Sequence, residues 1–155
     1  MTKKTIAACF AVVMFVLPTI AESDSPTPDL IGCLKAIEPL DLRYREWMRQ
    51  QCVGVAGDIC VATDQGTGNC LPELVGSMRS FYADLLPLLP TTIAGSTIRM
   101  RGYDSALNRA VSAFGDMSEC AGLEGYEFTT CEYVQLSAAT VDLLDCARFA
   151  DVPLP

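Results

Sequence analysis

Apolar residues recur every three or four positions through most of the chain after residue 29, which is the spacing of one face of an α-helix. No segment alternates apolar and polar residues over the length of a strand. Five helices are predicted, with breaks at proline, glycine and aspartate residues. Their apolar positions span residues 30–37, 44–59, 71–85, 103–117 and 128–144. The pattern therefore predicts an all-α fold, a single bundle of about five helices with short antiparallel connections.

Local signals predict where these helices begin and end. Thr27 is expected to cap the first helix, with Pro28 at its first position, and Asp41 is expected to cap the second. Prolines end the third helix and open a linker that continues to residue 96, in which residues 91–93 could be extended. The helical domain is expected to span residues 29–150, between a flexible lead-in at 22–28 and a tail at 151–155.

The chain begins with the three parts of a Sec-type signal peptide. Lys3 and Lys4 precede an apolar run at residues 6–17, and small residues follow it up to Ala21. We expect cleavage after Ala21, which would deliver the mature chain to the periplasm or the cell exterior. An uncleaved anchor is the weaker alternative, because the run is short for a membrane span and ends at Pro18. The mature chain is expected to make no membrane contact.

Export determines how the cysteines are interpreted. Cys9 would leave with the signal peptide, and in an oxidising compartment the remaining seven are expected to form disulfides rather than bind metal. Cys60 and Cys70 flank a glycine-containing turn between two helices, and Cys120 and Cys131 flank another. An antiparallel hairpin would bring the two members of each pair within bonding distance, so we expect both bridges.

Three further cysteines lie outside these two hairpins. A Cys33–Cys52 bridge would join the first helix to the second across the break at Pro39. Cys146 is then the odd thiol, near the end of the chain and free to dimerise or to stay reduced. A mature chain of about 134 residues can build its own hydrophobic core, so the bridges would reinforce this core rather than replace it.

The chain is strongly acidic. Removal of the signal peptide would leave nine basic and nineteen acidic residues, a net charge of −10. Such a charge argues against nucleic acid and anionic lipid as partners. It suits a cationic partner, and it equally suits a protein whose charge only keeps it soluble.

The residue types argue against catalysis. The chain has no histidine, which excludes Ser-His-Asp and Cys-His arrangements and the usual zinc sites. It has no CxxC pair and no phosphate-binding glycine loop. Asp116 and Glu119 are expected to share a helix face, and a solvated surface explains them more simply than a pair of catalytic carboxylates. We therefore predict no catalytic residue, no cofactor, no metal site and a protein that is not an enzyme.

Large aromatic residues at the helical spacing, namely Trp47, Phe81 and Phe114, are expected to pack in the core rather than contact a partner.

Two segments with spaced cysteines carry a family resemblance. One reads Cys-Val-Gly at 52–54, then Cys60, a glycine-containing loop and Cys-Leu at 70–71. The other reads Ala-Val-Ser-Ala-Phe-Gly-Asp at 110–116 and Glu-Cys-Ala at 119–121, with Cys131 to follow. Together they resemble the LprI-like domains, a family of secreted, cysteine-containing helical domains named after a lysozyme inhibitor.

This resemblance implies an exported periplasmic binding protein that protects the cell wall by occluding a basic, lysozyme-like glycoside hydrolase. Charge is compatible with such a partner, because lysozymes are commonly basic and an acidic domain would be attracted to one. The alternative is a cell-envelope interaction or structural module with no inhibitory activity. The binding surface and the oligomeric state stay open at this point.

Overall fold

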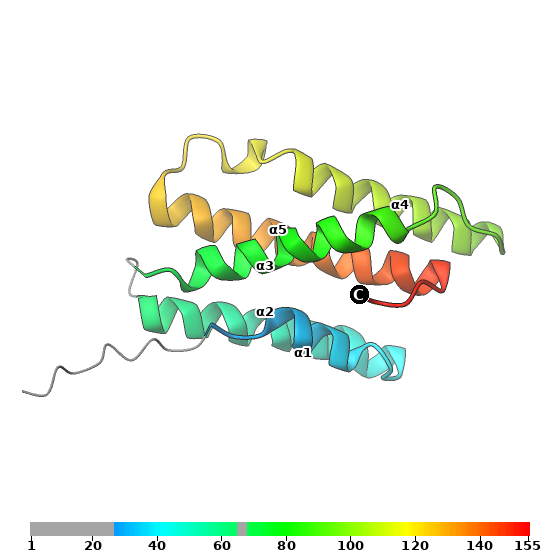
Figure 1. Ribbon diagram of the computed structural model, residues 1–155, viewed down its shortest axis with the longest axis horizontal. Helices are drawn as coiled ribbons and strands as arrows, with labels where there is room; N and C mark the ends of the chain where they lie inside the picture. The colour runs from blue at the N-terminus through cyan, green and yellow to red at the C-terminus, as the bar shows by residue number, and fades with distance from the viewer. Residues whose placement is uncertain (1–26, 65–67) are drawn as a thin grey trace, which may run out of the picture.

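The computed structural model describes residues 27–64 and 68–155, and within them it confirms the all-α bundle. The predicted signal peptide, its cleavage site at Ala21, Cys9 and most of the lead-in lie outside the described residues. Successive helices run in opposite directions along the bundle (Figure 1). They are α1 (Leu30–Ile37), α2 (Leu42–Asp64), α3 (Cys70–Leu85), α4 (Thr97–Gly115) and α5 (Gly125–Ala150), with short 3-10 turns η1 (Leu86–Leu88) and η2 (Ser118–Cys120).

The first helix is capped differently from the prediction. Asp29, not Thr27, caps α1, because its carboxylate accepts a hydrogen bond from the backbone N–H of Gly32 at 2.8 Å. Thr27 instead donates its hydroxyl to Glu73 on α3, which holds this end of the lead-in against the bundle. Asp41 caps α2 as predicted, accepting from the backbone N–H two residues later at 2.9 Å.

Two connections also differ from the prediction. Residues 91–93, which could be extended by sequence, instead include bends at 91 and 92, and the linker before α4 is fixed where the buried Tyr103 hydroxyl donates to the carbonyl of Pro90. The fourth helix ends before Asp116, so Asp116 and Glu119 do not share a helix face as expected. Both lie in the connection between α4 and α5. This connection begins after Gly115, earlier in the chain than the break that Gly122 predicts.

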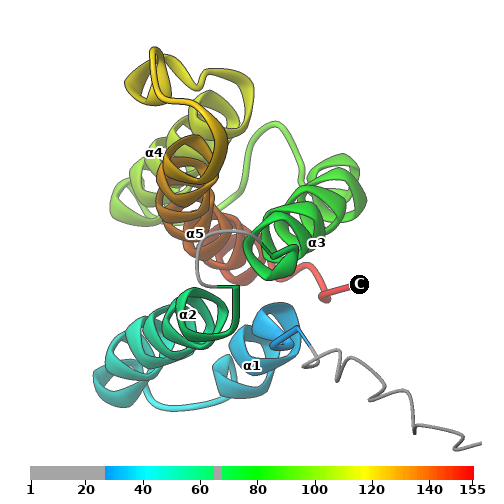
Figure 2. The same cartoon turned by 90° about the vertical axis from the view of Figure 1, so that its left-hand side faces the viewer.

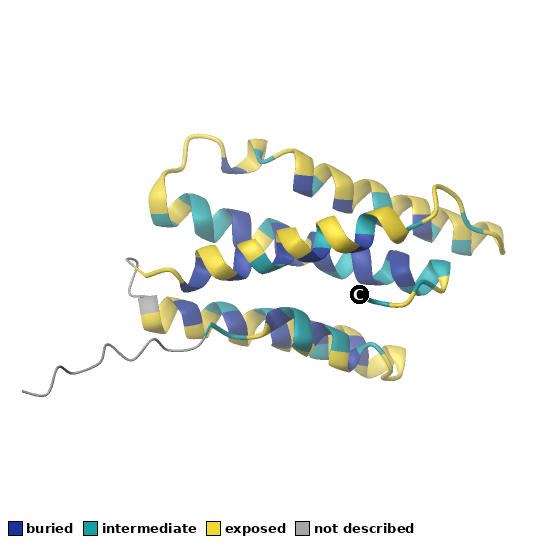
Figure 3. Ribbon diagram, viewed as in Figure 1, coloured by how far each residue is buried: buried dark blue, intermediate teal, exposed yellow. Residues whose placement is uncertain are grey.

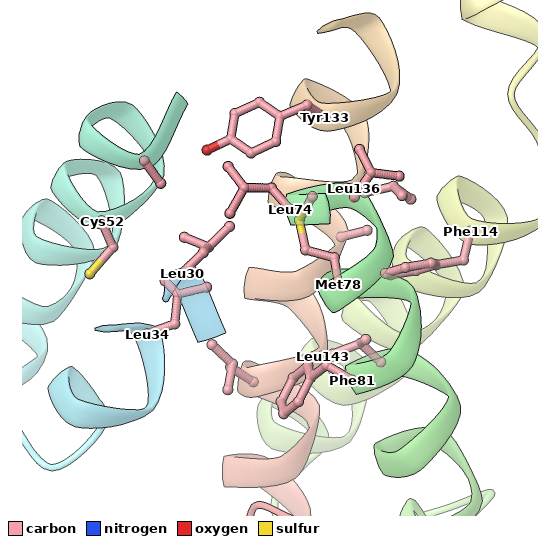
Figure 4. Packing of buried hydrophobic residues seen from close by; sticks show 14 of the residues in the cluster. Leu30, Leu34, Cys52, Leu74, Met78, Phe81, Phe114, Tyr133, Leu136 and Leu143 are labelled. Carbon is pink, nitrogen blue, oxygen red and sulfur yellow. The ribbon is translucent and has the colours of Figure 1, made fainter. Parts of the chain in front are cut away.

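α5 forms the centre of the fold, with α2, α3 and α4 packed around it (Figure 2). The dark buried positions of Figure 3 follow the inward faces of all five helices. Figure 4 shows leucines of α1, α3 and α5 meeting around Met78. The residues of this core that have at most 1% exposure include Leu30, Leu34, Leu71, Leu74, Met78, Leu85, Leu136, Leu143 and Leu144.

The aromatic residues follow the prediction in two of three cases. Phe81 is buried, and Phe114 is buried and stacks on Tyr82 with 4.1 Å between the ring centroids. The prediction for Trp47 is wrong, since this side chain lies on the outer surface of α2 and is 58% exposed. Position 47 is two residues, or about 200° around the helix, from each of the buried Arg45 and Arg49, so Trp47 lies on the opposite side of α2.

The disulfides join the pairs that the hairpin argument predicts. Cys60 and Cys70 are bridged with their Cα atoms 5.2 Å apart, and Cys120 and Cys131 with theirs 5.8 Å apart. The third bridge joins Cys33 of α1 to Cys52 of α2, with a Cα separation of 5.9 Å.

Among the described cysteines Cys146 is the free thiol, as expected, but one of its two suggested fates is wrong. Its side chain has no exposed surface, so it cannot reach a second chain in this fold. It packs with Tyr103 and Ala106 in a small second core between α4 and α5.

The tail after α5 folds back onto the bundle. Val152 and Leu154 pack against the core, and the carbonyl of Pro155 accepts a hydrogen bond from Lys35 of α1. None of the helices in the described ranges carries an apolar stretch that would be sufficient to cross a membrane.

Candidate functional site

The main concave surface is a groove that has α5 as its floor. Three cavities of about 600, 590 and 500 Å³ adjoin one another along this helix. The first two share Glu119 and Gln135, the last two share Val134, and the first and third share Ala138 and Asp142. In the ribbon of Figure 2, α2 and α4 lie on the same side of α5 without meeting. We call this surface the α5 groove.

Four parts of the chain line the groove. Its walls and floor include Glu46, Arg49, Gln50, Val53 and Gly54 of α2; Arg109 and Ser112 of α4; Asp116 and Glu119 of the following connection; and Glu127, Thr130, Val134, Ala138, Val141 and Asp142 of α5.

The floor of the groove is apolar and accessible. Val134 is 62% exposed, Ala138 is also exposed, and Val53 and Val141 are partly buried beside them. When a partner covers an exposed valine, its apolar surface is removed from water, and this burial favours binding. The floor can therefore contribute hydrophobic contact to binding.

The α2 wall is held close to α5 by a glycine. A Cβ at Gly57 would come within 2.9 Å of the Tyr133 ring on α5, so only glycine allows this spacing without displacement. The Tyr133 hydroxyl points toward α2 (Figure 4) and donates a 2.6 Å hydrogen bond to the carbonyl of Val53. The bond and the close approach together fix one wall of the groove.

A buried arginine fixes the same wall farther along. Arg49 of α2, only 3% exposed, donates to Glu38 after α1 at 2.6 and 3.0 Å and to Asp145 of α5 at 3.0 Å. Burial alone would lower the pKa of Arg49, but the hydrogen bonds and charges of the two carboxylates outweigh burial and raise the pKa above its usual value. Its positive charge is therefore balanced within the protein.

The opposite wall carries the other arginine of the groove. Arg109 donates to both carboxylate oxygens of Asp142, at 3.0 and 2.5 Å, and to the hydroxyl of Ser105 at 2.7 Å. The hydrogen bond to Asp142 raises the pKa of Arg109. Such a two-point pair fixes the guanidinium, so neither arginine of the groove offers a free positive charge.

Four exposed carboxylates remain around the groove: Glu46, Asp116, Glu119 and Glu127. Within the described part of the chain, none of the four has an ion-pair partner. Asp116 and Glu119 are held by neutral donors, the backbone N–H of Ser118 at 2.9 Å and the Gln135 amide at 3.0 Å. The rim of the groove is therefore negative.

One predicted disulfide contributes directly to this rim. Cys120 of η2 is bridged to Cys131 of α5, and Cys131 lines the groove. The bridge fastens the connection to α5, and Glu119, the neighbour of Cys120, consequently faces Gln135. The Cys60–Cys70 and Cys33–Cys52 bridges lie outside the lining of the groove, and so does Cys146.

The side chains of the groove define which chemistry it can offer. In the ranges 27–64 and 68–155, no cluster of three or more cysteine, aspartate or glutamate residues has the arrangement needed to hold a metal ion. Its ionisable groups are carboxylates, two paired arginines and the phenol of Tyr126, without a free thiol or an imidazole. The chemistry available is the attraction of cations to carboxylates next to an apolar floor.

Sequence reasoning did not identify most of the groove. Asp116 and Glu119 were considered, although on a helix face that does not form. Glu46 and Glu127 come from two helices and look like ordinary surface positions in the sequence. Val134 belongs to the apolar spacing that predicts the last helix, but the structure leaves it 62% exposed.

Comparison of this chain with protein-family models, with curated protein sequences and with solved structures finds no match.

Proposed function

We propose that this chain is an exported, non-catalytic binding protein whose α5 groove accepts a cationic segment of a partner protein. The observation that carries the proposal is the rim of four carboxylates without ion-pair partners, placed around an apolar floor. A lysine or arginine side chain matches both parts, because its apolar stem can cover valine and alanine while its charged end reaches a carboxylate.

The LprI-like resemblance suggests the partner, a basic lysozyme-like glycoside hydrolase. Insertion of a basic loop of that enzyme into the groove would place the body of the bundle beside the enzyme's cleft and occlude it. Electrostatic attraction would mainly accelerate association, whereas packing on Val134 and Ala138 would mainly slow dissociation.

The test is the kinetics of binding to several basic lysozymes, measured at low and at physiological salt. We expect the association rate to fall steeply as salt rises past about 0.1 M, where the Debye length is near 10 Å, and the dissociation rate to change much less. Cytochrome c, which is basic but has no cleft, should bind at least tenfold more weakly. Lysozyme activity should fall as the complex forms.

A matched pair of variants separates the groove from general acidity. Glu119→Gln with Glu127→Gln removes two charges from the rim, while Asp84→Asn with Asp104→Asn removes two charges that do not line the groove. At low salt the rim variant should associate about fivefold more slowly than wild type, and the control should stay within about twofold. Equal effects of the two variants, or equal binding of cytochrome c, would contradict the groove as the binding site.

The same experiment tests the alternative function. Binding that depends on the rim but leaves lysozyme activity unchanged would support an envelope interaction module that recognises a cationic partner without inhibiting it. Failure to bind any cationic protein would contradict both forms of the proposal.

A further inference from the structure

A second surface of the molecule is distinct from the groove in both place and chemistry. Along the outside of α2, five exposed residues follow one another at spacings of three or four: Tyr44, Trp47, Gln51, Val55 and Asp58. We call this surface the α2 stripe. Tyr44 is 61%, Trp47 58% and Val55 53% exposed, and Asp58 is the single charged member. Exposed aromatic and apolar residues grouped in this way commonly mark an interaction site.

We propose that the α2 stripe is a dimer interface, on which a second copy of this chain docks with its α2 antiparallel about a two-fold axis at Gln51. The low charge of the stripe is compatible with this occupant. The full sequence has a net charge of −8, so two copies repel each other over most of their surfaces. This repulsion is weakest where the surface is nearly uncharged, as on the stripe. A cationic partner, by contrast, would find only two carboxylates to recognise here, Asp58 on the stripe and Asp29 at the cavity beside Val55.

The stripe is complementary to itself about Gln51. Helix geometry of about 100° per residue places Trp47 and Val55 four residues to either side of Gln51 and about 40° to either side around the helix. A two-fold axis through Gln51 therefore sets Trp47 of each copy against Val55 of the other. The same operation sets Tyr44 against Asp58, where the phenol can donate a hydrogen bond to the carboxylate.

The surface beside Val55 has space for the indole. An apolar cavity of about 220 Å³ lies between α1 and α2, lined by Leu30, Met48, Cys52 and Val55 among others. A cavity of about 150 Å³ already accepts a benzene ring, so this one can take part of a tryptophan side chain. The indole of one copy would thus fill the cavity of the other, and the reverse contact would follow by symmetry.

The area agrees with a weak but specific dimer. From their exposures, covering Trp47, Tyr44, Val55 and Ile59 removes on the order of 400 Å² per copy, since a fully buried aromatic side chain hides 150–250 Å². With the residues around them the interface would total about 1,200 Å², the lower end of specific interfaces. We expect dissociation at roughly 10–100 µM, which is a modest affinity for this area.

The chain supplies its own reporter, because Trp47 is its single tryptophan. The oxidised protein should double in mass by sedimentation between about 1 and 200 µM, with a blue shift of tryptophan emission over the same concentrations. A monomer at 200 µM, or a dimer whose tryptophan emission does not change, would overturn the proposal.

Charge complementation tests the register. Trp47→Lys and Val55→Glu should each reduce self-association at least tenfold, because each buries an unpaired charge. Mixed together they should form a heterodimer, since the new lysine of one copy then faces the new glutamate of the other. Ile98→Lys and Ile98→Glu change an 85% exposed residue on α4 and serve as charge-matched controls that should dimerise like wild type. If the mixture stays monomeric, or the Ile98 variants lose the dimer equally, this interface is wrong.

Discussion

The contact between α2 and α5 at Gly57 makes a sharp prediction, since it sets the width of the α5 groove. Gly57→Ala would place a methyl group 2.9 Å from Cε1 of Tyr133, closer than carbon atoms normally approach. The ring cannot easily turn away, because Tyr133 is 6% exposed and its hydroxyl is bound to the Val53 carbonyl at 2.6 Å. Either α2 moves outward or the ring moves and loses this bond.

The magnitude follows from two opposing effects. Alanine is favoured over glycine in a helix interior by about 1 kcal/mol. Overpacking costs about 1–3 kcal/mol, and an orphaned buried hydroxyl adds about 1–3 kcal/mol if the bond breaks. We therefore expect Gly57→Ala to lower the free energy of unfolding by about 1–2 kcal/mol. Gly76→Ala is the matched control, because nothing lies within 4 Å of its Cβ position, and it should raise stability by up to about 1 kcal/mol.

The assay is urea unfolding of the oxidised protein, with the slope m checked for constancy. Tyr133→Phe completes a double-mutant cycle, since the ring can shift once its hydroxyl no longer anchors it. Gly57→Ala should then cost less in the Tyr133→Phe background than in wild type. The reasoning fails if Gly57→Ala is as stable as Gly76→Ala, or if the two substitutions at positions 57 and 133 are strictly additive.

Two further predictions concern buried charge and the free thiol. Arg49→Met should cost about 2–3 kcal/mol in urea unfolding, because it leaves Glu38 and Asp145 short of their buried partner, whereas Arg109→Met, which breaks the more exposed pair with Asp142, should cost less than about 1 kcal/mol. If the two losses are equal, the buried network does not stabilise the α2 wall. Burial, helped by the charges of Asp142 and Asp145, raises the pKa of Cys146 from 9.0 to about 12. The folded state then holds this proton more tightly than the unfolded state, so stability should fall as pH rises from 9 to 12, by up to about 1.4 kcal/mol per pH unit, and this part of the fall should be missing in Cys146→Ala.

The sequence could predict the helices because their apolar spacing and breaks are local properties. The bridges Cys60–Cys70 and Cys120–Cys131 can be predicted for the same reason, since each closes a single connection between two neighbouring helices. Trp47 was misplaced because α2 has apolar residues on more than one side. Periodicity shows that such a helix is amphipathic, but only the positions of the neighbouring helices decide which side is buried.

The groove could not be predicted in the same way. Glu46, Glu119 and Glu127 come from three separate elements, and they share a rim only because α2 and α4 lie on the same side of α5. The cap at Asp29 shows the same limit on a smaller scale. Threonine and aspartate are both suitable residues for a helix N-cap. In the structure Asp29 caps α1, while the Thr27 hydroxyl donates to Glu73, which is 46 residues away in the sequence.

The measurement that tests the central claim most directly is a hydrogen-exchange footprint of the protein bound to a basic lysozyme. The account predicts that protection on binding concentrates on the three sides of the α5 groove, around Gln50–Gly54, Ser112–Glu119 and Thr130–Asp142. It also predicts that α3 keeps the exchange rates of the free protein. A footprint centred on α3 or on Trp47, with the groove unprotected, would contradict the account.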